Sequence, residues 1–209
     1  MKVRSWKTIT ALAAAAGLAL VIAAAPSEAA TPVESAKASA GLSAGDLSKL
    51  PLTDRHLTKR EKANLAIVLR AYHVAEGNSL DVATFVNSFT KDGVFNDVVA
   101  GQTYQGPALG DVLNNMVGIF PDVHRELKQI TVRGDVVSIE LSIQGTFKGP
   151  LPTPAGSLKP NGAKVDVPTA DFWYLRNGKV EKFDCYVGYS VMFAQMGVNF
   201  DWASAVGNS

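Results

Sequence analysis

The hydrophobic pattern of this chain changes its period near Pro121. Before this residue, apolar side chains recur at the three- and four-residue spacing of amphipathic helices. After it they alternate with polar side chains, most regularly over residues 137–143, as in a half-buried antiparallel strand. Helices followed by consecutive strands predict an α+β domain, with the helices packed on one face of a curved, mostly antiparallel sheet.

Three helices are expected in the first half of the domain. The first begins at Thr58, which forms a capping-box pair with Glu61. The second follows the break at Gly77-Asn78, and the third ends at Pro121. A strand pattern over residues 94–106 separates the second helix from the third.

Antiparallel strands are expected in the second half. Asn177-Gly178 lies between two strand patterns and is a strong hairpin signal, because both residues tolerate positive φ. Residues 149–162 contain four prolines and cannot form a central strand, since each proline lacks a backbone donor. This segment is expected to be a loop, long enough to act as a lid or rim.

The N-terminal segment has the layout of a secretory signal peptide. Basic residues come first, an uncharged apolar run covers residues 9–25, and small residues follow. We therefore expect residues 1–30 to be a signal peptide and the protein to be secreted or periplasmic, without membrane contact after cleavage; the alternative is a retained anchor. The composition of residues 31–57 predicts a flexible linker, residues 58–200 the domain, and residues 201–209 a tail.

Charge and cysteine content exclude several classes of function. The chain has 20 Lys and Arg against 19 Asp and Glu, so the concentrated positive charge of a nucleic-acid-binding protein is missing. Cys185 is the single cysteine, which excludes an internal disulfide. His56 and His73 have no companion ligands at metal-binding spacing, so no metal is expected.

Asp171 is the candidate for chemistry. If its strand alternates, Asp171 shares a face with Trp173 and points toward the apolar interior. A buried carboxylate is either a structural acid bonded to a neighbour or a catalytic acid with a shifted pKa. The residues alone leave both interpretations open.

A set of short motifs then gives a resemblance. These are FPD at residues 120–122, GD at 134–135, GTFKG at 145–149, PNGAK at 160–164, an acid seven residues before Gly178, and QMG at 195–197. In order and spacing they resemble the SnoaL-like polyketide cyclase group of the nuclear-transport-factor-2-like superfamily, over roughly residues 62–198. Phe147 stands where the group has His, and Gly188 stands where it often has an acid.

The resemblance implies a cone-shaped α+β barrel that encloses an apolar pocket. It also implies that Asp171, on the fourth strand, is the general acid/base of an aldol-type ring closure that needs no metal or cofactor. An enolate would then need a nearby donor, for which Asn96 or Asp97 is the candidate, with Tyr72 or Tyr104 reaching in.

The predicted function is binding of a small apolar or polycyclic molecule, with Asp171 acting in a cyclase or isomerase reaction. The substrate-binding candidates share a place on the predicted pocket wall; they are Tyr72, Phe95, Asn96, Asp97, Phe147 and Trp173. The alternative is a non-catalytic binding module of the same fold, or a homodimer formed through the sheet face.

Overall fold

The computed structural model describes residues 42–198, together with Asp201 and Val206. The predicted signal peptide at residues 1–30 lies outside the described residues, as does most of the predicted tail at 201–209. In the part of the chain that the structure describes, no helix is long and apolar enough to cross a membrane.

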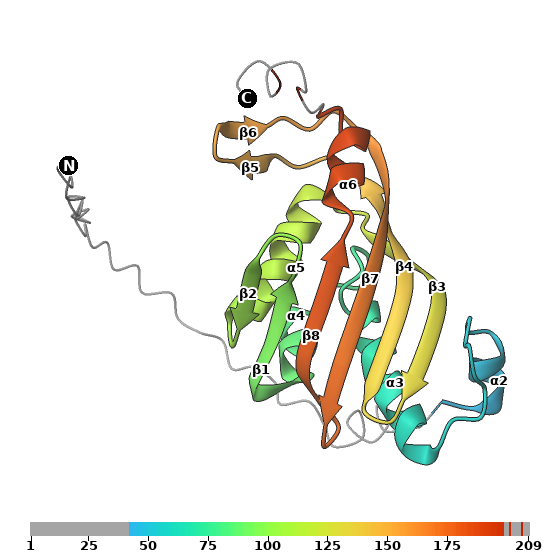
Figure 1. Ribbon diagram of the computed structural model, residues 1–209. Helices are drawn as coiled ribbons and strands as arrows, with labels where there is room; N and C mark the ends of the chain where they lie inside the picture. The colour runs from blue at the N-terminus through green and yellow to red at the C-terminus, as the bar shows by residue number, and fades with distance from the viewer. Residues whose placement is uncertain (1–41, 199–200, 202–205, 207–209) are drawn as a thin grey trace, which may run out of the picture. The chain divides into compact units, whose positions relative to one another are not determined.

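One sheet of six strands forms the body of the described domain (Figure 1). The strands are β1 (Phe89–Asp97), β2 (Gln102–Gln105), β3 (His124–Arg133), β4 (Val136–Thr146), β7 (Lys164–Arg176) and β8 (Lys179–Val187). Their order is β2-β1-β8-β7-β4-β3, and neighbours are antiparallel except β1 and β8, which are parallel. The predicted α+β class with a mostly antiparallel sheet is confirmed, and the sheet is open, with β2 and β3 as its edges.

The helices lie before, between and after the strands along the chain. They are α3 (Lys59–His73), α4 (Val82–Asn87), α5 (Ala108–Ile119) and α6 (Tyr189–Gln195). The predicted capping box is present, since the Glu61 N–H bonds the Thr58 hydroxyl and the Glu61 carboxylate accepts from the Thr58 N–H. Side chains of α3, α4 and α5 share one cavity with residues of the sheet, so these helices cover the same sheet face.

The hairpin at Asn177-Gly178 forms as predicted. Asn177 has φ of 52° and Gly178 has φ of 74°, the left-handed values that a tight turn between β7 and β8 requires. The first strand of this hairpin, β7, begins at Lys164. Asp171 therefore lies in the middle of this strand.

The proline-containing segment between β4 and β7 is more regular than predicted. It contains a short hairpin of β5 (Leu151–Thr153) and β6 (Gly156–Leu158), which pair only with each other. The side chain of Leu151 lines the cavity under the sheet. The segment is thus a rim with its own secondary structure.

The prediction of a flexible linker is wrong for residues 42–57. These residues include α2 (Ala44–Ser48), and Leu47 and Leu57 are both buried in the core. The Thr53 N–H donates to the Ile130 carbonyl at 2.9 Å. Burial of leucines and pairing with β3 hold this segment against the domain.

Candidate active site

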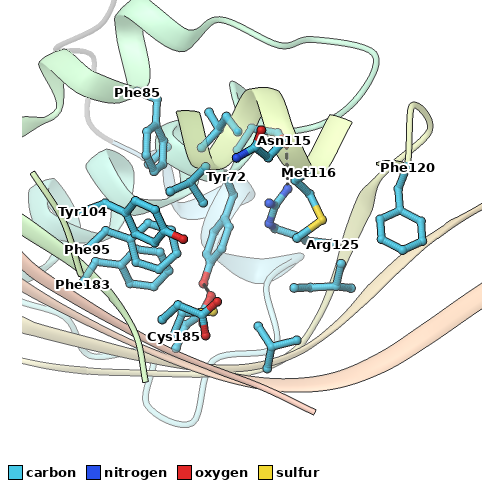
Figure 2. Close-up of a pocket in the computed structure, with 18 of the residues that line it drawn as sticks. Tyr72, Phe85, Phe95, Tyr104, Asn115, Met116, Phe120, Arg125, Phe183 and Cys185 are labelled. Atoms are coloured by element: carbon cyan, nitrogen blue, oxygen red, sulfur yellow. Dashed lines mark hydrogen bonds between the residues drawn. The ribbon is translucent and has the colours of Figure 1, made fainter. Parts of the chain in front are cut away.

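A cavity of about 190 Å³ lies between the inner face of the sheet and helices α3, α4 and α5 (Figure 2). Its walls come from strands β1, β2, β3, β4, β5, β7 and β8 as well as from the three helices and from α6. Most of the lining is aliphatic or aromatic. A site of this kind favours an apolar ligand oriented by a few polar groups.

Asp171 supplies the carboxylate at the centre of this cavity. On β7 it lies between Ile139 of β4 and Cys185 of β8, and it is 2% exposed. Its Oδ2 accepts a hydrogen bond of 2.6 Å from the hydroxyl of Tyr72. Among the described residues, Oδ1 has no hydrogen-bond partner. One oxygen is thus held in place, and the other is open to a proton.

Burial raises the pKa of the Asp171 carboxyl to about 6. The hydrogen bond from Tyr72, the Cys185 thiol and the charge of Arg125 each oppose this effect and limit the rise. A carboxylate with this pKa is mostly ionised at neutral pH, and its conjugate acid releases a proton readily. It can therefore both accept and return a proton in one reaction cycle.

Tyr72 fixes the orientation of the acid. It projects from α3, donates to Asp171 and accepts a 3.0 Å hydrogen bond from the Trp173 indole N–H. Burial and the neighbouring Asp171 charge raise the Tyr72 pKa well above its ordinary value, so the hydroxyl stays protonated. Because its proton is already donated to Asp171, Tyr72 positions this carboxylate and is not itself a free donor.

Stacked rings form one wall of the cavity. Trp173 and Phe183 stack with centroids 3.7 Å apart, and Phe183 stacks on Phe95 at 4.6 Å. Figure 2 shows Phe95, Phe183 and Tyr104 together on one side of Tyr72. This wall is a continuous apolar surface that suits a ring of a ligand.

Asp97 is a second carboxylate that lines the cavity, at the end of β1. It accepts hydrogen bonds from the Tyr189 hydroxyl and from the Ala100 N–H. Burial and this contact raise the Tyr189 pKa, so the Tyr189 proton stays in place. Asp97 is thus engaged as an acceptor and does not offer the donor that the sequence analysis sought.

Two predicted pocket residues lie elsewhere. Asn96 alternates with the inward Phe95 and Asp97, so it faces the opposite side of the sheet, where its amide donates to Asp184 at 2.7 Å. Phe147 is fully buried against Phe120, with ring centroids 6.2 Å apart, and does not line the cavity. The other predicted residues do line it; they are Tyr72, Phe95, Asp97, Asp171 and Trp173.

Arg125 and Asn115 are polar cavity residues that sequence reasoning missed. The alternation of Ile130 and Val132 along β3, extended backward, would turn Arg125 outward. The pairing of β3 with β4 shifts its register between Leu127 and Gln129, and this irregularity reverses the phase. Arg125 therefore faces inward, opposite Ile143, which also lines the cavity. The sequence signal that could have indicated the shift is the three-residue spacing between the apolar Leu127 and Ile130, where regular alternation has two.

Cys185 is buried, and its side chain lines the cavity next to Asp171. Burial raises its thiol pKa well above the ordinary value. Within the described residues, no group of three or more His, Cys, Asp and Glu side chains is arranged to hold a metal ion.

Comparison with known families identifies the domain. The family model described as a SnoaL-like domain matches residues 68–183, which is more than half of the chain. The chain belongs to the SnoaL-like domain family. Comparison with curated proteins gave no match.

Solved structures agree with this SnoaL-like assignment at the level of the fold. A proposed SnoaL-like polyketide cyclase from Jannaschia sp. CCS1 superposes with a TM-score of 0.60 and 19% identity, covering 70% of this chain and 100% of that one. A proposed polyketide cyclase from Bacillus cereus ATCC 10987 gives 0.58 and 20%, covering 73% and 94%. A Catenulispora acidiphila protein of the ketosteroid isomerase-like fold gives 0.52 and 24%, covering 65% and 95%. Identities this low establish the fold alone.

Proposed function

We propose that this SnoaL-like domain catalyses a cofactor-independent proton transfer next to a carbonyl, of the cyclase or isomerase type, with Asp171 as general acid/base. The observation that carries the proposal is the Asp171 carboxylate itself, which is 2% exposed, has a pKa of about 6, and lies in an apolar cavity. If Asp171 had only a structural role, burying its carboxylate without a paired cation would lower the stability of the fold.

The local geometry supports a division of roles. Tyr72 holds Oδ2, so Oδ1 is the atom that would take the proton from carbon. The aromatic wall would hold a ring of the substrate against Trp173 and Phe183. Loss of the proton gives an enolate, and the protonated Asp171 then returns the proton at a different atom.

The size of the cavity limits the substrate. An apolar cavity of about 150 Å³ holds a benzene molecule, and this cavity measures about 190 Å³. A compact molecule of one or two rings therefore fits the site as it stands. A larger polycyclic substrate would need the rim near Leu151 to open.

The test uses β-tetralone, a bicyclic ketone with exchangeable protons next to its carbonyl. Exchange into deuterium oxide is followed by NMR with the wild-type protein, with Asp171→Asn and with the control Asp184→Asn. We expect the wild type to accelerate exchange and Asp171→Asn to lose about 100-fold or more of that acceleration. The control should stay within about threefold of wild type, since Asp184 lies on the other sheet face.

Undiminished exchange by Asp171→Asn would show that the catalytic assignment is wrong. A wild-type protein that binds β-tetralone without accelerating exchange would instead favour a binding module of the same fold. Circular dichroism of each variant establishes that a loss of exchange does not come from unfolding.

A further inference from the structure

A cation lines the cavity on the side away from the aromatic wall. Figure 2 shows Arg125 beside Met116, with Tyr72 between them and the rings of Phe95 and Phe183. The Arg125 side chain is 12% exposed, and its guanidinium carbon lies 6.0 Å from the centroid of the Tyr72 ring. A charge so withdrawn from water requires partners.

Within the described part of the chain, only one nitrogen of the guanidinium has hydrogen-bond partners. Nη1 donates to the Ala75 carbonyl at 2.8 Å and to Glu76 Oε1 at 3.4 Å. Among the described residues, Nε and Nη2 have no hydrogen-bond acceptor. An arginine has five N–H donors in a planar fork, so the larger part of the fork is left for a group inside the cavity.

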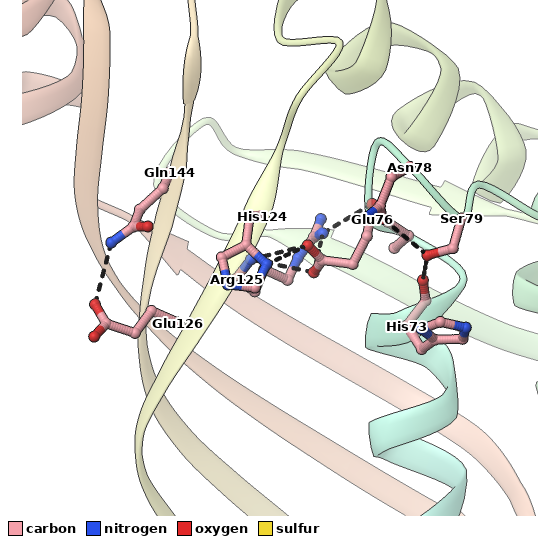
Figure 3. Close-up of polar contacts among 9 residues, drawn as sticks. His73, Glu76, Asn78, Ser79, His124, Arg125, Glu126 and Gln144 are labelled. Atoms are coloured by element: carbon pink, nitrogen blue, oxygen red, sulfur yellow. Dashed lines mark hydrogen bonds and ion pairs between the residues drawn. The ribbon is translucent and has the colours of Figure 1, made fainter.

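Glu76 holds Arg125 in this position (Figure 3). Both oxygens of its carboxylate accept from the Arg125 backbone N–H, at 3.1 and 3.2 Å, while Oε1 also contacts the side chain. The Nδ1 of His124 lies 2.8 Å from Oε2 on the exposed side. The guanidinium is thus fixed before any ligand arrives, which lowers the entropic cost of binding.

Three parts of the cavity lining therefore differ in chemistry. The aromatic wall lies on one side of Tyr72, and the fixed cation of Arg125 lies on the other side. Asp171 accepts the hydrogen bond of Tyr72 between them. A planar guanidinium fork matches a carboxylate, which accepts two parallel hydrogen bonds from it. The arrangement suits a ligand with a ring at one end and a carboxylate at the other.

We propose that Arg125 is a specificity-determining residue that binds a carboxylate of the substrate, so that this cavity takes small aryl or cyclic carboxylic acids. The inference rests on the proposed function, because it names the substrate class of the same site. The competing role for Arg125 is structural, namely to tie the turn at residues 75–77 to β3. That role needs only the contacts of Nη1, and it predicts that ligand affinity does not depend on the charge of the ligand.

The test compares two probes of nearly equal shape, trans-cinnamate and its neutral analogue cinnamamide. Dissociation constants are measured by isothermal titration at about pH 7.5, where a carboxylate is ionised. We expect the wild type to bind cinnamate about tenfold more tightly, as for a charge-assisted hydrogen bond. Arg125→Gln should remove this preference, weakening cinnamate about tenfold and cinnamamide by less than about threefold.

Two further variants keep the result interpretable. Arg125→Lys retains the charge but not the fork, and should recover part of the preference for cinnamate. Arg133→Gln removes a cation from the exposed end of the same strand and should leave both constants unchanged. The thermal unfolding midpoint of each variant is measured in parallel.

Three results would overturn the proposal. They are equal affinity of the wild type for the two probes, equal weakening of both probes by Arg125→Gln, and no binding of cinnamate at millimolar concentration. Failure here is separable from failure of the proposed chemistry. β-Tetralone is neutral and tests Asp171 by exchange, while Asp171→Asn should keep the preference for cinnamate.

Discussion

Asp171 and Asp184 are buried acids on opposite faces of one sheet, and they differ in their hydrogen-bond and ion-pair partners. They lie on adjacent rungs of the β7–β8 ladder, where Asp171 pairs with Cys185 and Phe172 pairs with Asp184. Both residues are nearly inaccessible, at 2% and 8% exposed. On the outer face, Asp184 has a cation, because the Lys182 ammonium lies 2.6 Å from its Oδ2.

On the inner face, Asp171 has a hydroxyl as its hydrogen-bonded partner and no ion pair among the described residues. The Asn96 amide completes the outer site at 2.7 Å, whereas Oδ1 of Asp171 is left unsatisfied. Satisfied charges stabilise a fold, while an unsatisfied one in a cavity is suited to exchanging protons. The difference favours Asp171 over Asp184 as the carboxylate of the proposed chemistry.

The pH dependence of proton exchange should show the largest effect. If Asp171 is the base, the rate with β-tetralone follows its ionised fraction, which is set by the pKa of about 6. Between about pH 4 and about pH 7 the enzyme-dependent rate should then rise roughly 100-fold and level off. Asp184→Asn should leave the midpoint unchanged, and a rate that is flat over this range would break the distinction between the two acids.

The stability of the two asparagine variants should differ in its response to pH. The Asp171 pKa is about 6 in the folded protein against 3.8 for an ordinary aspartate, so the folded state loses stability as pH rises from about 4 through about 6. Asp171→Asn removes this loss. From about pH 4 to about pH 7.5, the wild type should lose about 2.5 kcal/mol relative to Asp171→Asn, as measured by urea unfolding.

Asp184→Asn should lower the stability of the protein by removing an ion pair. It leaves Lys182 without its carboxylate, and this contact raises the pKa of the Lys182 ammonium in the folded protein. We expect a loss of about 2 kcal/mol at neutral pH. Equal pH responses in the two variants would contradict the assignment of an uncompensated charge to Asp171.

Tyr72→Phe tests the contribution of the hydrogen-bond partner of Asp171. It deletes the hydrogen bond to Oδ2 of Asp171 and removes the acceptor of the Trp173 indole N–H. A hydrogen bond to a charged group is worth about 1.5–3 kcal/mol, so the Asp171 pKa should rise by about one to two units. The midpoint of the exchange profile measures this rise, and an unmoved midpoint would show that Tyr72 does not orient the base.

A change on the outer face should have the smallest effect. The Lys182 ammonium lies 4.0 Å from the centroid of the Tyr174 ring. Tyr174→Leu should cost about 0.5–1 kcal/mol of stability in urea unfolding and leave the exchange rate unchanged. A fall in the exchange rate would mean that the two faces are coupled through β7.

Much of this architecture could be predicted from local patterns. Period changes and turn residues gave the α+β class, the capping box at Thr58 and the hairpin at Asn177-Gly178, because these depend on neighbours in sequence. Alternation with Trp173 likewise placed Asp171 on the inner face. Such features need no knowledge of how distant strands pair.

The features that were missed depend on long-range pairing. The register shift between Leu127 and Gln129 turns Arg125 into the cavity, and it exists only because β3 pairs with β4. Residues 42–57 have the composition of a linker, yet Leu47 and Leu57 pack on the core. The backbone of this segment bonds Ile130 of β3, a contact that local sequence does not predict. Asn96 was a mistaken choice because neighbouring residues of a strand face opposite sides of the sheet. Of the pair Asn96 and Asp97, Asp97 faces the cavity.

The most direct test of the central claim is the titration of Asp171 itself. Carboxyl-carbon NMR of the ligand-free protein would follow each aspartate with pH, with Asp171→Asn assigning the signal. The account predicts a midpoint of about 6 for Asp171. A midpoint at or below about 4, the value of an ordinary aspartate, would contradict the account and leave Asp171 as a structural acid.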